Sequence, residues 1–267
     1  MRIAVVQFEI AHQAPEKNWE RIEQFIQKAV TQTAEVIIFP EDCITGSLFG
    51  DITKLDTTET TKQSFQRLAL QYKIDIVTGS VMTGTAQGNF NTSYYIDATG
   101  TVLGTYSKNH LYPSEYAFLT PGSTAPVFET RFGKAAIVIC WDLLFSELFQ
   151  RLVRDGVEII YCPSYWYREI AETMATYNTE SEEEQIDALC RVRALETNCL
   201  LVYANAAGIM TYKNGSKDTL IGHSQLVLPQ IGAQKKLSHR NEELFVETVD
   251  LSLLKKTNAI YQLREPS

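Results

Sequence analysis

Three residues that can do chemistry stand where predicted strands end. Cys140 closes the apolar run 135–139, whose length and β-branched content are typical of a buried strand. Glu41 and Lys108 each follow another strand-like run. A thiol can attack an electrophilic carbon, a carboxylate can move its proton, and an ammonium group can stabilise developing negative charge. Because open α/β folds place their chemistry at the carboxyl ends of strands, we expect these three side chains to form one site.

The elements that would position these residues alternate along the chain, which predicts an α/β fold. We expect helices at 16–31, 60–72, 145–155 and 184–197. We expect strands at 3–9, 35–39, 75–82, 91–97, 101–107, 157–161 and 199–205, a turn at Gly88-Asn89, and a hairpin-rich stretch at 221–250. The chain has no repeat, low-complexity tract or Pro/Gly linker, so we expect residues 1–267 to form a single domain.

The composition argues against several classes of protein. The 24 basic and 32 acidic residues give a net charge of −8 without a Lys/Arg cluster, so we expect no nucleic-acid partner. No apolar stretch reaches the roughly 20 residues that span a bilayer, and residues 1–7 are predicted to be a strand and not a signal peptide. We therefore expect no membrane association. Five cysteines, an odd number without zinc-like spacing, predict no metal site and fit a cytoplasmic location.

The segment 176–187 is rich in acids and includes Glu182, Glu183 and Glu184. Its ordinary interpretation is the solvated start of a helix, where carboxylates are favoured by the helix dipole. The alternative is a mobile acidic lid that covers the site and repels anionic substrates. Both interpretations are compatible with the sequence.

The motifs around the three chemical residues, in their order along the chain, resemble the nitrilase superfamily of carbon–nitrogen hydrolases. The blocks that carry the resemblance are Phe39-Pro40-Glu41, residues 106–111 with Glu115, and Ile139-Cys140-Trp141-Asp142 with Glu147. Supporting positions include Asn91-Thr92, Arg193-Ala194, Asn205 and His223-Ser224. The resemblance covers roughly residues 3 to 250. It implies an αββα four-layer sandwich, a homodimer and no cofactor.

The resemblance also implies a role for each residue of the site. Cys140 is expected to be the nucleophile that forms a thioester, and Glu41 the general base. Lys108 and the backbone N–H of Trp141 are expected to stabilise the tetrahedral oxyanion. Glu115 is expected to orient Lys108 or the amine of the substrate.

Five further residues are expected around this centre. Asp142 and Glu147 are interpreted as hydrogen-bonding residues that fix the nucleophile loop. Tyr165 and Trp166 follow the next predicted strand and are expected to wall the substrate pocket, together with Leu144. An aromatic core cluster is the alternative interpretation of Tyr165 and Trp166.

Two departures from the family pattern bear on the substrate. Nitrilases tend to carry Glu after the Cys-Trp pair, so Asp142 points to the amidase and carbamoylase branches. Branches that accept ω-carboxylates place Arg three or four residues after the cysteine, where this chain has Leu143 and Leu144, and apolar side chains cannot hold a carboxylate. We expect a small amide or N-carbamoyl substrate whose distal end is neutral, apolar or cationic.

Three other functions stay open from the sequence. A Cys–His peptidase would use Cys140 with His223, and would tolerate Glu41→Gln and Lys108→Ala. A non-catalytic relative would keep the fold for binding or scaffolding. An acyltransferase would keep the same site but transfer the acyl group to an amine in place of water.

Overall fold

A sheet of seven strands forms one half of the molecule. The computed structural model describes residues 1–168, 176–212, 215 and 217–263. The strands of this half are β1 (Arg2–Glu9), β2 (Val36–Ile38), β3 (Asp75–Val77), β4 (Val81–Thr85), β5 (Gly88–Ile96), β6 (Val102–Ser107) and β15 (Glu243–Thr248). Their order is β4-β5-β3-β2-β1, with β6 also paired to β5 and β15 also paired to β1. Helices α1 (Pro15–Thr31) and α2 (Thr60–Tyr72) pack on this sheet.

The other half has a second group of strands with its own helices. These strands are β7 (Phe128–Thr130), β8 (Gly133–Ile137), β9 (Ile159–Ser164), β10 (Leu200–Ala207), β13 (Gln225–Leu228) and β14 (Gly232–Lys236). Helices α3 (Ser146–Arg154) and α5 (Ser181–Thr197) pack together and against this half. The two halves are joined where the end of β1 pairs in parallel with β10, at Phe8↔Ala206 and Glu9↔Ala207.

Shorter elements complete the described chain. They are the hairpin β11 (Ile209–Thr211) and β12 (Lys217–Thr219), the 3-10 turns η1 (Ile52–Lys54), η2 (Pro113–Ala117) and η3 (Cys140–Leu144), and helix α6 (Ser252–Tyr261). Within the described ranges, no helix has both the length and the apolar character needed to cross a bilayer.

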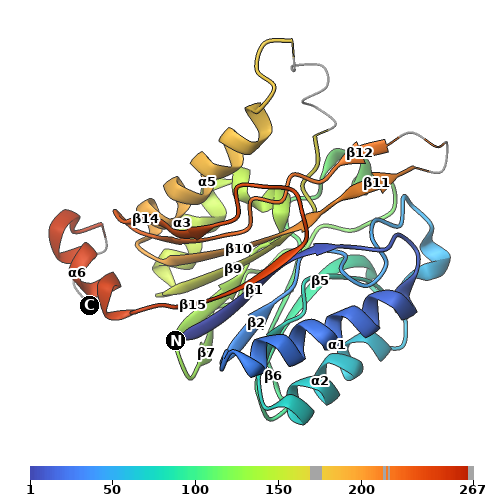
Figure 1. Ribbon diagram of the computed structural model, residues 1–267, viewed down its shortest axis with the longest axis horizontal. Coiled ribbons are helices and arrows are strands. Elements are labelled where there is room, and N and C mark those ends of the chain that lie inside the picture. The colour runs from blue at the N-terminus through green and yellow to red at the C-terminus, as the bar shows by residue number, and fades with distance from the viewer. Residues whose placement is uncertain (169–175, 213–214, 216, 264–267) are drawn as a thin grey trace.

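The two halves stack as a four-layer sandwich because both faces of the sheets are apolar. Successive side chains of a strand point to opposite faces. In β1, Ile3 and Val5 therefore belong to the core between the sheets, whereas Ala4 and Val6 belong to the core beneath α1 and α2. Figure 1 shows α1 and α2 on one side of the sheets and α3 and α5 on the other. The predicted αββα arrangement is confirmed.

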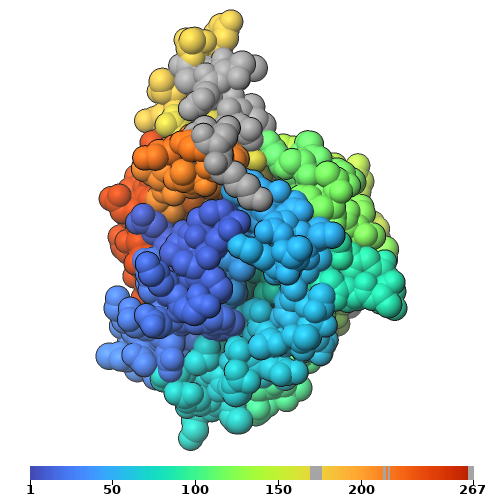
Figure 2. Space-filling view, turned by 90° about the vertical axis from the view of Figure 1, so that its right-hand side faces the viewer, coloured from blue at the N-terminus to red at the C-terminus, as the bar shows by residue number. Residues whose placement is uncertain are grey.

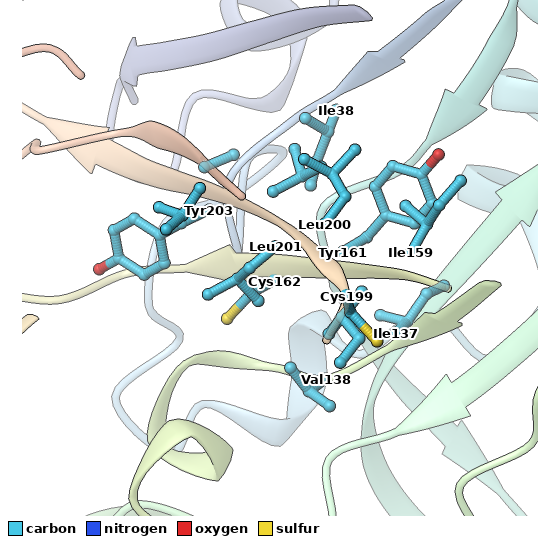
Figure 3. Packing of buried hydrophobic residues seen from close by; sticks show 14 of the residues in the cluster. Ile38, Ile137, Val138, Ile159, Tyr161, Cys162, Cys199, Leu200, Leu201 and Tyr203 are labelled. Atoms are coloured by element: carbon cyan, nitrogen blue, oxygen red, sulfur yellow. The ribbon is translucent and has the colours of Figure 1, made fainter. Parts of the chain in front are cut away.

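The core between the sheets and around the second sheet is close-packed and apolar. Figure 3 shows Ile38 of the first sheet near Ile159 and Tyr161 of the second. Cys162 and Cys199 lie in the same cluster and are fully buried. All five cysteines are free thiols.

Several predicted boundaries differ from the structure. The predicted strand 75–82 is two strands, β3 and β4, because the backbone turns at Gly79, whose φ is +74°. A Cβ at Gly79 would lie 2.1 Å from the carbonyl oxygen of Pro40, so only glycine allows this approach. Gly88-Asn89 already belongs to β5, so the predicted turn there is wrong by two residues. Helix α5 begins at Ser181, three residues before the predicted start.

Candidate active site

The structure brings together the three residues predicted to share a site. Glu41 follows β2, Lys108 follows β6, and Cys140 follows β8 as the first residue of η3. The Lys108 Nζ atom lies 2.9 Å from Glu41 Oε1, and each residue is only 2% exposed. Charged side chains are seldom buried this deeply unless they are paired. The first sheet therefore supplies an acid and a cation to a thiol carried by the second.

Glu115 joins the same cluster from η2. Lys108 Nζ donates to Glu115 Oε2 at 2.9 Å, and the backbone N–H of Tyr112 donates to the same oxygen at 2.6 Å. Asn91 connects the two carboxylates, because its Nδ2 donates to Glu41 Oε1 at 2.8 Å and to Glu115 Oε1 at 3.4 Å. The sequence pointed to Asn91 only as part of a motif. Its place on β5, a buried strand, is what aims its amide at the acids.

Electrostatics favour a charged Lys108 and a basic Glu41. Burial alone would lower the pKa of Lys108, but the charges of Glu41 and Glu115 outweigh it and raise this pKa well above its ordinary value. Burial raises the pKa of Glu41, while Lys108 opposes the shift. The backbone N–H of Tyr165 donates to Glu41 Oε2 at 2.9 Å and fixes the carboxylate. Glu41 is thus a stronger base than an exposed glutamate.

Cys140 is held in an uncommon backbone conformation, with a φ of +47°. Such a conformation costs a non-glycine residue about 1–3 kcal/mol and persists only where the surroundings enforce it. Burial and the charge of Glu41 raise the pKa of the Cys140 thiol well above its ordinary value, although Lys108 and the N–H of Tyr165 oppose this shift. The thiol is therefore neutral at rest, and the carboxylate of Glu41 is its hydrogen-bonding partner. This arrangement suits a nucleophile that is deprotonated as it attacks.

Asp142 holds the turn that carries the thiol. Its Oδ2 accepts hydrogen bonds from the N–H of Ile139 at 2.9 Å and from the hydroxyl of Tyr106 at 2.7 Å. Its Oδ1 lies 2.9 Å from the backbone nitrogen and 2.8 Å from Nδ1 of His110. The side chain is fully buried. These contacts connect the strands and turns on either side of Cys140.

Glu147 does not have the role predicted for it. It is exposed in the first turn of α3, where the helix dipole favours a carboxylate. The sequence distance from Cys140 is short, but the turn η3 comes between them and directs Glu147 toward solvent.

A cavity of about 570 Å³ opens beside the cluster. Glu41, Lys108, Glu115 and Cys140 line it together with Trp141, and so do the predicted pocket residues Tyr165 and Trp166. Tyr167, which follows them in the sequence and was expected beside them, also lines the cavity. Further aromatic lining residues that the sequence did not reveal are Phe49, Tyr112, Phe118 and Tyr212. Figure 2 shows the light-blue segment around residues 45–55 beside the green part of the chain, and Leu48 packs there against Leu111 and Leu119.

Leu144 was predicted to line the pocket, and this prediction is wrong. Its side chain is 40% exposed and lies outside the cavity lining. Leu143 is fully buried in the hydrophobic core that includes residues of α3 and α5, and its carbonyl accepts a hydrogen bond from Arg193 Nε at 2.8 Å. The 3-10 turn rotates both side chains away from the thiol, so they cannot decide which substrate end is accepted.

The acidic segment is exposed at residues 176–180, but at the start of α5 it is neither a fully solvated helix start nor a detached lid. Glu182 and Glu183 are 4% and 5% exposed, and only Glu184 of the three faces solvent. Glu182 Oε2 accepts a hydrogen bond from Trp166 Nε1 at 2.8 Å and lines the cavity. Glu183 pairs with Arg168 and Arg240. The segment is anchored at the wall of the cavity.

His223 lies outside the cavity lining. Its Nδ1 is 3.2 Å from Asp187 Oδ1, on α5. The charged groups that act on the Cys140 thiol are Glu41 and Lys108. The geometry therefore does not support a Cys140–His223 pair.

Comparison with known proteins agrees with this geometry. The model of the carbon–nitrogen hydrolase family matches residues 2–259. A protein described as a hydrolase in the agr operon of Staphylococcus lugdunensis is 31% identical, over 83% of this chain and 90% of the relative. N-carbamoylputrescine amidase from Oryza sativa is 26% identical, over 99% of this chain and 91% of the relative.

A solved structure has the same fold. It is an amidase mutant from Nesterenkonia that shows covalent addition of the acetamide moiety of fluoroacetamide at the active-site cysteine. Its TM-score is 0.79 at 23% identity, covering 98% of this chain and 95% of that one. The match of the family model over nearly the whole sequence, together with the 31% identical relative, shows that the chain belongs to the carbon–nitrogen hydrolase family.

Proposed function

We propose that this protein hydrolyses a non-peptide C–N bond in a small amide or N-carbamoyl compound through a thioester on Cys140. The observation that carries the proposal is the buried Glu41–Lys108–Glu115 cluster beside this thiol, at the wall of a cavity. A volume of about 570 Å³ suits a small molecule. The amidase names of several relatives agree with this reaction class.

In the first half-reaction, Cys140 Sγ attacks the carbonyl carbon while Glu41 accepts the thiol proton. The oxyanion of the tetrahedral intermediate lies within reach of two donors, Lys108 Nζ and the N–H of Trp141. When this intermediate collapses, the C–N bond breaks and the proton on Glu41 passes to the departing nitrogen. Ammonia or an amine leaves, and the acyl group remains on Cys140.

In the second half-reaction, water attacks the thioester carbon. Glu41 accepts a proton from this water, the C–S bond breaks, and the proton returns to the sulfur. Glu115 keeps the ammonium group of Lys108 in place through both steps by its 2.9 Å contact. An amine in place of water would give acyl transfer, which remains the second candidate activity.

The test is ammonia release from a panel of aliphatic amides, N-carbamoyl amines, ω-amidated carboxylates and nitriles. We expect turnover of amides or carbamoyl compounds that is lost in Glu41→Gln and Lys108→Ala. Activity that survives both substitutions would contradict the proposal and favour a Cys–His mechanism. Ammonia release that rises only when an acceptor amine is added would identify an acyltransferase.

The cavity lining supports exclusion of a distal carboxylate. Among the described lining residues, Lys108 is the one basic side chain, and it already forms ion pairs with Glu41 and Glu115. A substrate carboxylate would be desolvated without a partner, which is costly. We therefore propose that the distal end of the substrate is neutral, apolar or cationic. The proposal is based on the lining of the cavity, to which Leu144 does not belong.

We also propose that the protein is a cytoplasmic homodimer. Val192 and Leu195 on α5 are 50% and 39% exposed, and Leu144, on the turn η3 that contacts α5, is 40% exposed. An apolar strip of this kind is typical of an interface between subunits. Light scattering after size-exclusion chromatography tests the dimer, and Val192→Glu is expected to yield monomers.

A further inference from the structure

Two carboxylates in the cavity have no part in the proposed hydrolysis. Asp42 and Glu182 both line the cavity and are 5% and 4% exposed. They come from distant parts of the chain, one next to Glu41 and the other from the first turn of α5. Buried carboxylates normally have a cationic or hydrogen-bonding partner, so each needs an explanation.

Asp42 is the less satisfied of the two. Its Oδ1 atom is buried and has no hydrogen-bond partner among the described residues. Burial and the nearby charges of Glu41 and Glu115 raise the pKa of Asp42 well above its ordinary value, although Lys108 and Ser80 oppose this shift. A cation bound beside Asp42 would lower this pKa and favour the charged carboxylate. Its backbone is held with a φ of +55°, and its N–H bonds to Ser80 Oγ at 3.2 Å. The fold thus holds an acid in the cavity wall that forms no direct ion pair with any of the described residues.

Glu182 is held in place on the wall formed by α5. The indole N–H of Trp166 binds Glu182 Oε2 at 2.8 Å. The next residue, Glu183, is fixed by Arg168 and Arg240, and this contact anchors the start of the helix. The carboxylate of Glu182 is therefore positioned by Trp166 but forms no ion pair with any of the described residues. A side chain that recognises a charged ligand must be held in place while its own charge stays unpaired.

Aromatic rings line the same cavity as these acids. Trp141 lies 5.4 Å from Trp166 and 4.9 Å from Tyr112, measured between ring centroids, and Tyr112 lies 6.0 Å from Tyr167. All four rings line the cavity. The faces of such rings attract cations, and the attraction grows when the cation is desolvated. With Lys108 already paired, the described lining carries an excess of negative charge.

We propose that the cavity selects a substrate whose distal end is an organic cation, such as a primary ammonium group, and that Asp42 and Glu182 supply the counter-charge. The inference rests on the proposed hydrolase function for its turnover test, but not for its binding test. Asp42 and Glu182 are specificity residues in this account, and the reacting carbonyl is left to Cys140, Glu41 and Lys108.

The turnover test compares three amides of matched length: 5-aminopentanamide, hexanamide and 5-carboxypentanamide. We expect kcat/KM for the ammonium compound to exceed that for hexanamide about tenfold or more, since hydrogen bonds to charged groups are the stronger class. The carboxylate compound is expected to be the poorest substrate. A ratio of one or below between the first two, with good turnover of hexanamide, would overturn the inference and leave the hydrolase function standing.

The variants Asp42→Asn, Glu182→Gln and their combination show which acid is responsible. We expect the preference for 5-aminopentanamide over hexanamide to fall about tenfold in the double variant. Glu184→Gln is the matched control, because it removes the same charge from the same helix turn but at an exposed position. It is expected to keep the preference. An unchanged preference in the double variant would contradict the assignment of these two acids.

Binding to Cys140→Ala, measured by calorimetry, separates the inference from the proposed function. This variant keeps Asp42, Glu182 and the aromatic wall. Tighter binding of 5-aminopentanamide than of hexanamide is expected even if no amide is hydrolysed by the wild type. Equal binding of the two amides would overturn the inference, whereas absence of turnover alone would overturn only the hydrolase function.

Discussion

At the scale of single residues, burial and pairing decide what each group of the site can do. Lys108 is held cationic by two acids, and the thiol of Cys140 is held neutral by burial and by the charge of Glu41. The proton transfer from sulfur to Glu41 is therefore part of the attack. A preformed thiolate, the usual route for cysteine nucleophiles with a lowered pKa, is not available here.

The pH dependence of hydrolysis follows from Glu41. The base works only when it is deprotonated, and burial raises its pKa above the ordinary value. Activity should therefore appear with rising pH at a higher pH than an exposed glutamate would give, whose pKa is about 4.3. The acidic limb of the kcat/KM profile measures this. A value of kcat/KM that stays at its plateau down to a pH of about 4 would contradict a raised pKa of Glu41.

The sequence predicted the site residues correctly where their position at the end of a strand was enough to place them. Glu41, Lys108 and Cys140 could be found because each follows a strand, and parallel strands bring their ends together. Leu144 could not be placed, since the direction of a side chain in a 3-10 turn is set by tertiary packing. Asp42 was missed for a related reason, because its positive φ turns it into the cavity wall.

At the scale of elements, the turn η3 links the nucleophile to the hydrogen bonds that shape it. Asp142 accepts most of these hydrogen bonds. The donors are Tyr106 in β6, His110 in the chain after β6, and Ile139, which follows β8. We expect Asp142→Asn to destabilise the protein by about 1–3 kcal/mol, because its amide group would face a buried donor. It should also lower kcat. Urea unfolding and steady-state kinetics test both effects.

Glu147→Gln is the control for this prediction. Glu147 is exposed on α3, so its loss should change stability by less than about 0.5 kcal/mol. Equal effects of the two substitutions would mean that Asp142 does not hold the turn.

A second element-scale prediction concerns the approach of β3 to the segment before Glu41. In Gly79→Ala the new Cβ would meet the Pro40 carbonyl at 2.1 Å, so the backbone that carries Glu41 must shift. We expect a stability loss well above the roughly 1 kcal/mol of a positive-φ alanine, together with a fall in kcat.

Gly156→Ala separates strain from collision. Gly156 has a φ of +83°, but its Cβ would meet nothing nearer than 3.6 Å. Gly156→Ala should lose only the stability that an alanine loses at a positive φ, and it should keep its activity. Thermal unfolding of the two variants gives the comparison, and equal losses would show that the contact with Pro40 has no special cost.

At the scale of the whole molecule, the site exists only where the two sheets meet. Glu41 and Lys108 come from the first sheet, and Cys140 and Tyr165 come from the second. The alternation of strands and helices predicted an α/β fold, whereas the four-layer sandwich was implied only by the family resemblance. The sequence could not predict how the start of α5 packs. Its charges are those of a solvated helix, and only the tertiary partners Trp166, Arg168 and Arg240 explain their burial.

This arrangement predicts that activity and tertiary structure disappear together. Separation of the sheets would remove Cys140 from Glu41, so hydrolysis and the near-ultraviolet circular dichroism should fall with the same midpoint in urea. Activity that outlasts the loss of tertiary signal would show that one half of the sandwich is sufficient.

The proposed mechanism requires a thioester on Cys140, which mass spectrometry of the acid-quenched reaction would detect. During turnover of a small amide, we expect the intact mass to increase by the acyl group less one hydrogen, with the modification mapped to the peptide that contains Cys140. The peptide with Cys162, a free thiol in the core, should stay unmodified. Cys140→Ala should show neither adduct nor turnover. Turnover that persists in Cys140→Ala would contradict the account.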